Sequence, residues 1–154
     1  MIYKGATLVP PSILLVDDEA GFLEALSRRM VKRGLKVSTA LSGADALKKL
    51  KKGGGSSNFD VVILDVKMPG MDGLETLSKI KLEHPNLEVI MLTGHATVEN
   101  AIEGMKSGAF DYLMKPCAID LLVMKIDRAV IKKREHEGKI LEARAQMIAS
   151  RMGY

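Results

Sequence analysis

Apolar positions along this chain fall into two kinds of segment: short unbroken aliphatic runs and longer stretches with helical spacing. Continuous runs at 13–16, 61–64 and 89–92 predict strands at 13–16, 60–65 and 87–92, and they are typical of strands that are buried on both faces of a parallel sheet. Alternating or weaker runs at 35–40 and 109–114 complete five expected strands. Because helical stretches separate these runs, the pattern predicts an α/β fold with right-handed crossovers.

The stretches between the runs place apolar residues three or four positions apart, as amphipathic helices do. They predict helices at about 20–32, after Ser42, after Gly73, after Thr97 and at about 119–131. Thr97 is expected to cap the fourth helix. The inward face of that helix is expected to carry four residues: Val98, Ala101, Ile102 and Met105.

Domain organisation follows from where this alternation starts and stops. Residues 1–11 end in two prolines and are interpreted as a lead-in, and 12–131 form one domain. A polar segment at 132–139 and a last amphipathic stretch make 132–154 a helical tail or linker. The glycine-rich segment 53–57 precedes a strand and lacks a following Lys-Ser or Lys-Thr, so we interpret it as a surface connection and not a phosphate loop.

Composition excludes several classes of protein. With 47% hydrophobic and 27% charged residues in 154, the chain is expected to be a globular protein. Its net charge of +4 is spread along helices without interleaved aromatics, which argues against nucleic-acid binding. No run approaches the about 18 apolar residues of a membrane span. The single Cys117 fits a reducing compartment, so a cytoplasmic location is expected.

Acidic residues follow two of the buried strands. Asp17 and Asp18 come after the first strand, and Asp65 ends the third. Ligands of open α/β sheets bind outside the carboxyl ends of the strands, so these carboxylates should meet at one rim. Crowded carboxylates are costly unless a cation neutralises them, and an all-oxygen cluster suits Mg²⁺.

Two further polar residues are expected at the same rim. Thr93 ends the fourth strand, and Lys115 follows the fifth. Carboxylates, a divalent cation, an ammonium and a hydroxyl together suit phosphoryl transfer, which needs positioning and charge neutralisation. Asp65 leaves the central strand and is the best-placed nucleophile for an aspartyl phosphate.

Four segments carry a resemblance to a known family. They are 16–19 (Val-Asp-Asp-Glu), 64–73 (Leu-Asp-Val-Lys-Met-Pro-Gly-Met-Asp-Gly), 93–95 (Thr-Gly-His) and 110–116 (Phe-Asp-Tyr-Leu-Met-Lys-Pro). In this order they resemble the receiver domain of two-component response regulators. The resemblance implies a flavodoxin-like sheet with strand order 2-1-3-4-5.

The resemblance also implies a role for each site residue. Asp65 would accept a phosphoryl group from a histidine kinase, and Lys115 would hold the phosphate. The peptide bond between Lys115 and Pro116 would be cis. The Mg²⁺ ligands would be Asp18, Asp65 and the backbone carbonyl of Lys67, with Asp17 acting through water. Thr93 would turn toward the phosphate, and Tyr112 would rotate inward as a switch.

The segment 93–102 is similar to receivers of nitrogen-regulation-type (sigma-54-dependent) transcriptional activators. An output domain or protein, with transcription as its output, is therefore an expected partner. A homodimer is expected either through the switching face (fourth helix, fifth strand, fifth helix) or through the tail. Lys67 and His95 occupy variable family positions, and we hypothesise that they tune the phosphate lifetime.

Two other classes of protein are alternative interpretations of the sequence. A metal-dependent phosphatase with an aspartyl nucleophile would, by resemblance, carry a second acid two residues later, where this chain has Lys67. A flavodoxin-like cofactor binder needs a glycine- or hydroxyl-rich loop after the first strand, where this chain has acids. A non-enzymatic signalling receiver is the expected function.

Overall fold

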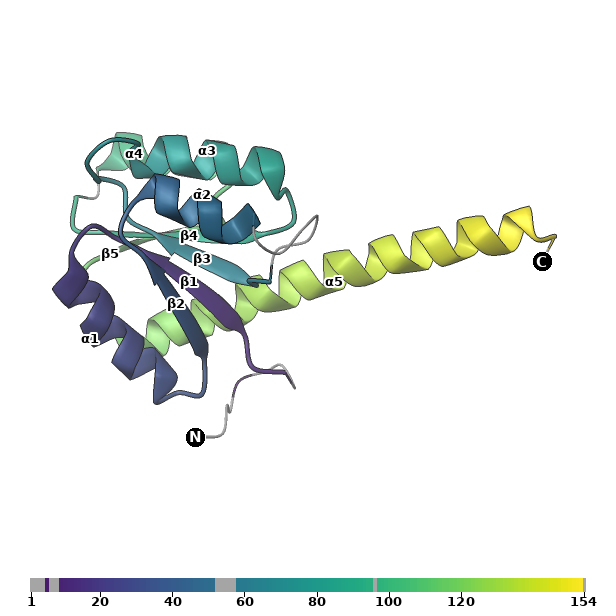
Figure 1. Ribbon diagram of the computed structural model, residues 1–154, viewed down its shortest axis with the longest axis horizontal. Coiled ribbons are helices and arrows are strands. Elements are labelled where there is room, and N and C mark those ends of the chain that lie inside the picture. Colours follow the sequence, from purple (N-terminus) through teal and green to yellow (C-terminus); the bar gives the residue numbers. More distant parts are fainter. Residues whose placement is uncertain (1–4, 6–8, 52–57, 96, 154) are drawn as a thin grey trace.

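The computed structural model describes residues 5, 9–51, 58–95 and 97–153. Most of the expected lead-in and the whole of segment 53–57 lie outside these residues. Within the described part, five strands alternate with five helices (Figure 1). In chain order they are β1 (Ser12–Val16), α1 (Ala20–Val31), β2 (Lys36–Ala40), α2 (Gly43–Lys51), β3 (Val61–Leu64), α3 (Gly73–Glu83), β4 (Glu88–Thr93), α4 (Val98–Lys106), β5 (Asp111–Met114) and α5 (Ile119–Arg151).

The strands form one parallel sheet in the order β2-β1-β3-β4-β5. This is the expected order, and with its helices it makes the flavodoxin-like fold. Helices α1 and α5 cover one face of the sheet, while α2, α3 and α4 cover the other (Figure 1). The central strand β3 lies between β1 and β4, so its carboxyl end opens at the middle of the rim.

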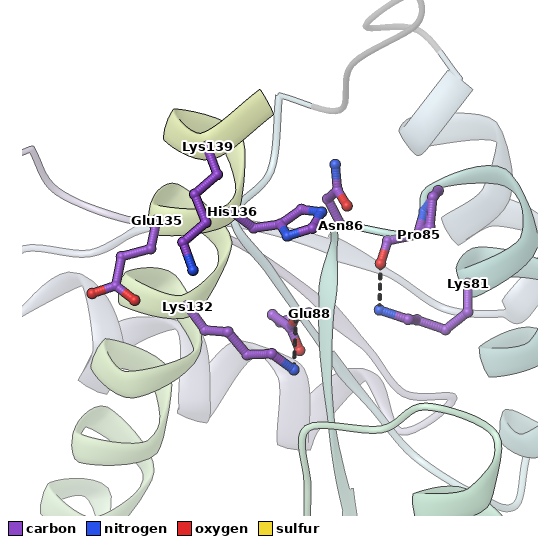
Figure 2. Close-up of a pocket in the computed structure, with 8 residues that line it drawn as sticks. All are labelled: Lys81, Pro85, Asn86, Glu88, Lys132, Glu135, His136 and Lys139. Atoms are coloured by element: carbon purple, nitrogen blue, oxygen red, sulfur yellow. Dashed lines mark hydrogen bonds and ion pairs between the residues drawn. The ribbon is translucent and has the colours of Figure 1, made fainter. Parts of the chain in front are cut away.

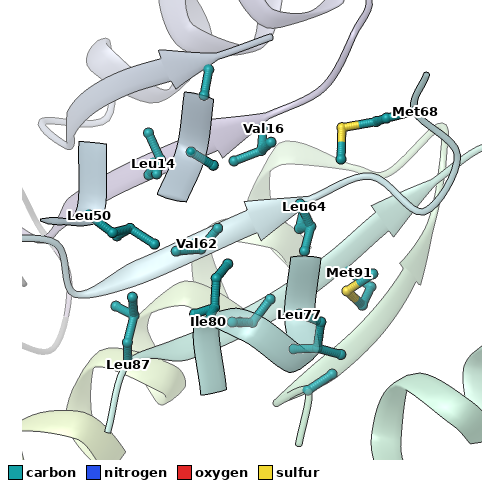
Figure 3. Packing of buried hydrophobic residues seen from close by; sticks show 14 of the residues in the cluster. Leu14, Val16, Leu50, Val62, Leu64, Met68, Leu77, Ile80, Leu87 and Met91 are labelled. Carbon is teal, nitrogen blue, oxygen red and sulfur yellow. The ribbon is translucent and has the colours of Figure 1, made fainter. Parts of the chain in front are cut away.

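Both faces of the central strands are buried, as their aliphatic runs predicted. Successive side chains of a strand point to opposite faces, so Leu14 and Val16 join one core and Ile13 and Leu15 the other. Figure 3 shows the first core, where Leu14, Val62 and Leu64 lie close to the side chains of α2 and α3. Burial on both sides fixes the register of the strands that deliver the site residues.

The prediction of which residues of α4 face inward is wrong. Thr97 does cap this helix, because its side chain accepts a hydrogen bond from the Asn100 amide. However, three of the four expected core residues are exposed: Val98 (72%), Ile102 (51%) and Met105 (48%). The buried residue of α4 is Gly104, beside Tyr112, Leu74 and Met91. The helix packs through its smallest side chain, which leaves the larger apolar ones facing outward.

The tail continues α5 without a break. The helix runs from Ile119 to Arg151 and projects away from the domain (Figure 1). The polar segment 132–139, which was expected to belong to the helical tail or linker, is part of α5, and Gly138 does not interrupt the helix. Lys133 and Arg134 explain this continuity, because both pair with Asp60 at the edge of the sheet. These two residues therefore hold this part of α5 against the edge of the sheet.

Candidate functional site

Backbone hydrogen bonds extend the sheet past the ends of its strands and hold the site residues. The Asp17 amide donates to Ala40 O (3.1 Å), and the Asp65 amide donates to Val16 O (3.0 Å). Lys115 donates likewise to Thr93 O (2.8 Å). The chain therefore leaves each strand only after a functional residue has been placed at the rim. The Lys115–Pro116 peptide bond is cis, as the resemblance implied.

The three aspartates gather at this rim as expected. Asp17 and Asp65 are buried, with 2% and 3% exposure, and Asp18 is exposed. Each offers one carboxylate oxygen, and these atoms lie within 4.8 Å of one another. Three hard oxygen ligands at this spacing fit a magnesium ion, which typically keeps several waters besides one or two carboxylates. The donor set therefore matches the metal expected from the sequence.

Lys115 faces the aspartates from the neighbouring edge of the sheet. Its ammonium lies 2.5 Å from Asp17 Oδ2 and 4.0 Å from both Asp65 Oδ2 and Glu19 Oε1. On its other side the Nζ atom is 3.9 Å from the centre of the Phe22 ring. The lysine side chain is only 15% exposed, so its charge is screened little by water.

Burial works against the charge of Asp65. Desolvation raises the pKa of its carboxyl, and the nearby negative charge of Asp17 raises the pKa further. The Thr93 hydroxyl, the positive charge of Lys115 and a hydrogen bond from the Val66 amide (2.8 Å) lower it. The raising effects win, so the pKa of Asp65 lies above the ordinary value of 3.8. A cation beside this group would favour its ionised, nucleophilic form.

The loop after β3 forms one wall of the site and requires glycine twice. Gly70 has a φ of +76°, a conformation that side chains disfavour. A Cβ on Gly73 would collide with the Asp65 carbonyl oxygen and lie 2.7 Å from Val66 Cα. The start of α3 thus packs directly on the backbone at the end of β3. Asp72 caps α3 by accepting a hydrogen bond from the Glu75 amide (2.9 Å).

A cleft of about 420 Å³ opens above Asp18 and Asp65. Glu19, Asp72 and the backbone turn at Met68–Pro69 also line it. Lys67 and His95, which we expected to flank a bound phosphate, lie on its rim and are exposed. The cleft is therefore open enough to admit a donor group to Asp65.

Thr93 and Tyr112 lie on the same face of the sheet, toward α3 and α4. Thr93 is fully buried, and its hydroxyl oxygen accepts a hydrogen bond from the His95 amide (3.0 Å). Tyr112 is half-buried beside Gly104. Burial of its hydroxyl, with the negative charge of Asp65, raises the pKa of Tyr112, so the phenol stays neutral. Both residues stand between the aspartate cluster and α4.

Two contacts of Lys115 were not anticipated. They are with Glu19 and Phe22, neither of which was among the site residues expected from the sequence. Phe22 lies in the first turn of α1 with core spacing, so no local pattern separates it from Leu23 or Leu26. Cys117 is partly buried and burial raises the pKa of its thiol, which suits an unreactive side chain.

A second pocket, of about 360 Å³, lies at the opposite end of the sheet (Figure 2). It opens between α5 and the connection from α3 to β4. Two of its lysines have partners within the pocket: Lys132 lies 3.5 Å from buried Glu88, and Lys81 donates a hydrogen bond to Pro85 O (2.8 Å). None of the expected site residues lines it. The chemistry expected from the sequence belongs to the aspartate rim.

Comparison with known proteins agrees with this geometry. The model of the response regulator receiver domain matches residues 13–127. This chain belongs to that family. It is 38% identical over 125 residues to the DNA-binding transcriptional regulator NtrC of Escherichia coli, covering 81% of this chain and 26% of the relative. It is 36% identical over 133 residues to ZraR of Klebsiella oxytoca, covering 86% and 29%. The chain thus spans about a quarter of the length of these relatives.

Solved structures show the same fold. A receiver domain from Clostridium thermocellum superposes with a TM-score of 0.74 at 39% identity, covering 80% of this chain and 97% of that one. NtrX from Brucella abortus superposes with a TM-score of 0.76 at 31% identity, covering 86% and 30%. Among the described helices of this chain, none is both long and apolar enough to cross a membrane.

Proposed function

We propose that this chain is the phosphoacceptor of a two-component system and that Asp65 takes a phosphoryl group from the phosphohistidine of a histidine kinase. One observation carries the proposal: the buried Asp65 carboxylate lies at an open cleft, beside Asp17 and Asp18 and 4.0 Å from the Lys115 ammonium. This arrangement supplies a nucleophile and a positive charge for the transferred group.

The transfer itself needs no oxidant or further reactant. A carboxylate oxygen of Asp65 attacks phosphorus, the O–P bond forms and the P–N bond of the donor breaks. The electron pair of that bond returns to the imidazole nitrogen, which takes up a proton. Lys115 is placed to balance the charge on the phosphoryl oxygens, and the Thr93 hydroxyl is placed to donate to one of them.

Mg²⁺ is the cofactor in this proposal. Asp18, Asp65 and the backbone carbonyl of Lys67 would hold the ion, with Asp17 acting through a water molecule. When bound, the ion supplies positive charge that neutralises the carboxylates and phosphoryl oxygens. The raised pKa of Asp65 supports this assignment, because crowding and burial disfavour its charge without a cation.

Phosphorylation would be read out on the switching face (α4, β5 and α5). The phosphoryl group carries nearly two negative charges in place of the single charge of the carboxylate, and it recruits Thr93, which biases a two-state element. Tyr112 would follow by turning further inward beside Gly104. The face carries exposed apolar side chains that a partner could cover: Val98, Ile102, Met105, Met114, Leu121 and Met124.

The wider assignment has several parts. The boundaries we propose are a lead-in at 1–11, the receiver at 12–131 and a helical tail at 132–154. The domain would act as a switch and not as an enzyme, in the cytoplasm, where a lone Cys117 stays reduced. Its partners would be a histidine kinase and a downstream output, with transcription as the regulated process. A second copy could join through the switching face or through the tail.

The test is labelling by a small radiolabelled acyl phosphate in the presence of Mg²⁺. We expect wild-type protein to be labelled and Asp65→Asn to fall below about 1% of the wild-type rate, as for loss of a nucleophile. Asp72→Asn is the matched control, because it removes an acid from the same cleft while keeping the α3 cap, and it should be labelled. Undiminished labelling of Asp65→Asn would show that another residue accepts the phosphoryl group.

A further inference from the structure

Lys115 has two kinds of partner, and one of them is aromatic. Its ammonium lies 2.5 Å from Asp17 Oδ2 and 3.9 Å from the centre of the Phe22 ring. We propose that Phe22 is a positioning residue, which holds the Lys115 ammonium facing Asp65 by a cation–π interaction. The inference rests on the proposed function and adds to it a residue outside the polar cluster.

The ring is fixed where it can do this. Phe22 lies in the first turn of α1 and packs against the core between α1, α5 and the sheet. It also lines a small cavity together with Asp17 and Asp65. Because Lys115 is 85% shielded from solvent, its interaction with the ring face has little competition from water.

The acidic partners alone do not keep Lys115 at the phosphoacceptor. Its shortest contact is with Asp17, and Asp65 is 4.0 Å away. A divalent ion held by these carboxylates would compete with the lysine for their negative charge and would repel its ammonium. The Phe22 ring binds no such ion, so it remains a partner for the lysine. We therefore infer that the ring matters most when the site is loaded with metal.

The alternative is that Phe22 only packs in the hydrophobic core and has no effect on Lys115. Phe22→Leu separates the two roles, because leucine keeps an apolar side chain in the α1 core but has no π face. Phe22→Tyr is the matched control, since it keeps the ring. A purely structural role predicts that both variants differ from wild type only in stability.

The first readout requires neither metal nor phosphate. An ammonium over an aromatic ring places its ε-methylene protons in the ring-current field, so the Lys115 ε-proton resonances should lie upfield of the other lysines. We expect this upfield shift in wild type and in Phe22→Tyr, and its loss in Phe22→Leu. Equal Lys115 shifts in wild type and Phe22→Leu would overturn the contact.

The second readout is the labelling rate with a small acyl phosphate at saturating Mg²⁺. A cation–π contact of ordinary strength predicts a rate about 2- to 30-fold lower in Phe22→Leu and within about 2-fold of wild type in Phe22→Tyr. In a Lys115→Met background, Phe22→Leu should cause no further loss, because the ring acts through the lysine. A similar loss in both backgrounds would overturn the positioning role.

The outcomes distinguish this inference from the proposed function. If wild-type protein is not labelled at all, the phosphoacceptor assignment fails, and the proton shifts still decide whether Phe22 holds Lys115. If wild type is labelled and Phe22→Leu matches it in rate and in shift, only the Phe22 inference fails.

Discussion

Asp65 is placed where its own charge is disfavoured. Its pKa is raised first by burial and then by the charge of Asp17, while Thr93, Lys115 and the Val66 amide offset only part of this. The nucleophile that we propose needs the ionised form of Asp65. That form is disfavoured unless a positive charge lies beside the carboxylate. Such conflict between stability and chemistry is common at functional sites.

This conflict predicts how stability depends on pH. An aspartate whose folded-state pKa lies above its unfolded value stabilises the fold below the unfolded pKa, and that stability is lost as pH rises through the folded pKa. Asp65→Asn avoids the loss. Near pH 7 we expect the free energy of unfolding of Asp65→Asn to be about 1–2 kcal/mol higher than that of wild type. This difference should shrink as the pH falls toward about 4. Chemical denaturation across this window measures it.

Glu142→Gln is the matched control for this experiment, because it removes the same charge from an exposed position on the tail. It should leave stability within about 0.5 kcal/mol of wild type at every pH. A lower stability of Asp65→Asn at neutral pH, or a difference that does not vary with pH, would contradict the account. Adding Mg²⁺ should narrow the difference near pH 7, because the ion relieves the same repulsion.

At the scale of elements, α5 leaves the domain beside Asp60. The Asp60 carboxylate accepts hydrogen bonds from the Ser12 amide (2.9 Å) and from Arg134 (3.2 Å), and lies 3.8 Å from buried Lys133. Lys133 also pairs with Glu137 one turn on. This network joins the start of β1 to the middle of α5, where the helix leaves the domain. It fixes the direction in which the tail leaves.

Asp60→Asn tests this network. The variant keeps the volume of the side chain but removes the charged partner of Arg134 and one of the two charged partners of buried Lys133. We expect the free energy of unfolding to fall by about 1–3 kcal/mol and the backbone amides of 133–137 to exchange faster with solvent. Hydrogen exchange followed by mass spectrometry measures the second effect. Glu137→Gln, which spares Asp60, should change both less; unchanged exchange in Asp60→Asn would show that the network does not hold the helix.

Some elements could be predicted from the sequence, whereas several contacts between elements could not. The central strands were predictable because burial on both faces gives a short continuous aliphatic run between turn signals. The inner face of α4 was not, because periodicity cannot show that Gly104, and not the larger residues, faces Tyr112. The contact that holds α5 against the sheet could not be predicted either, because Asp60 lies 74 residues before Arg134 and looks like an ordinary strand-end acid. The contact of Phe22 with Lys115 was hidden in the same way.

For the whole molecule, the projecting part of α5 is the least supported by tertiary contacts. An isolated helix of this kind is marginal in water. Its exposed side chains include Leu141 (64%), Ile148 (57%) and Met152 (64%), which with Ala145 are spaced 4-3-4 as in a coiled-coil seam. We therefore expect a second copy to pack along this stripe.

Sedimentation equilibrium tests this expectation. The chain should form dimers with a Kd in the micromolar range. A Kd of 1 μM corresponds to a free energy of dissociation of about 8 kcal/mol. The variant Leu141→Lys/Ile148→Lys should be monomeric at the same concentrations, whereas Ile102→Lys on α4 leaves the stripe intact and should still associate. Association lost in Ile102→Lys and kept in the tail variant would move the interface to the switching face. A monomeric wild type would exclude both.

Chemical identification of the phosphorylated residue tests the central claim most directly. Wild-type protein labelled with an acyl phosphate and Mg²⁺ is reduced with borohydride, which converts an aspartyl phosphate to homoserine, and is then digested and sequenced by mass spectrometry. We expect homoserine at position 65 and at none of the other aspartates. Homoserine at position 17 or 18, or a phosphoryl group stable to this reduction, would contradict it.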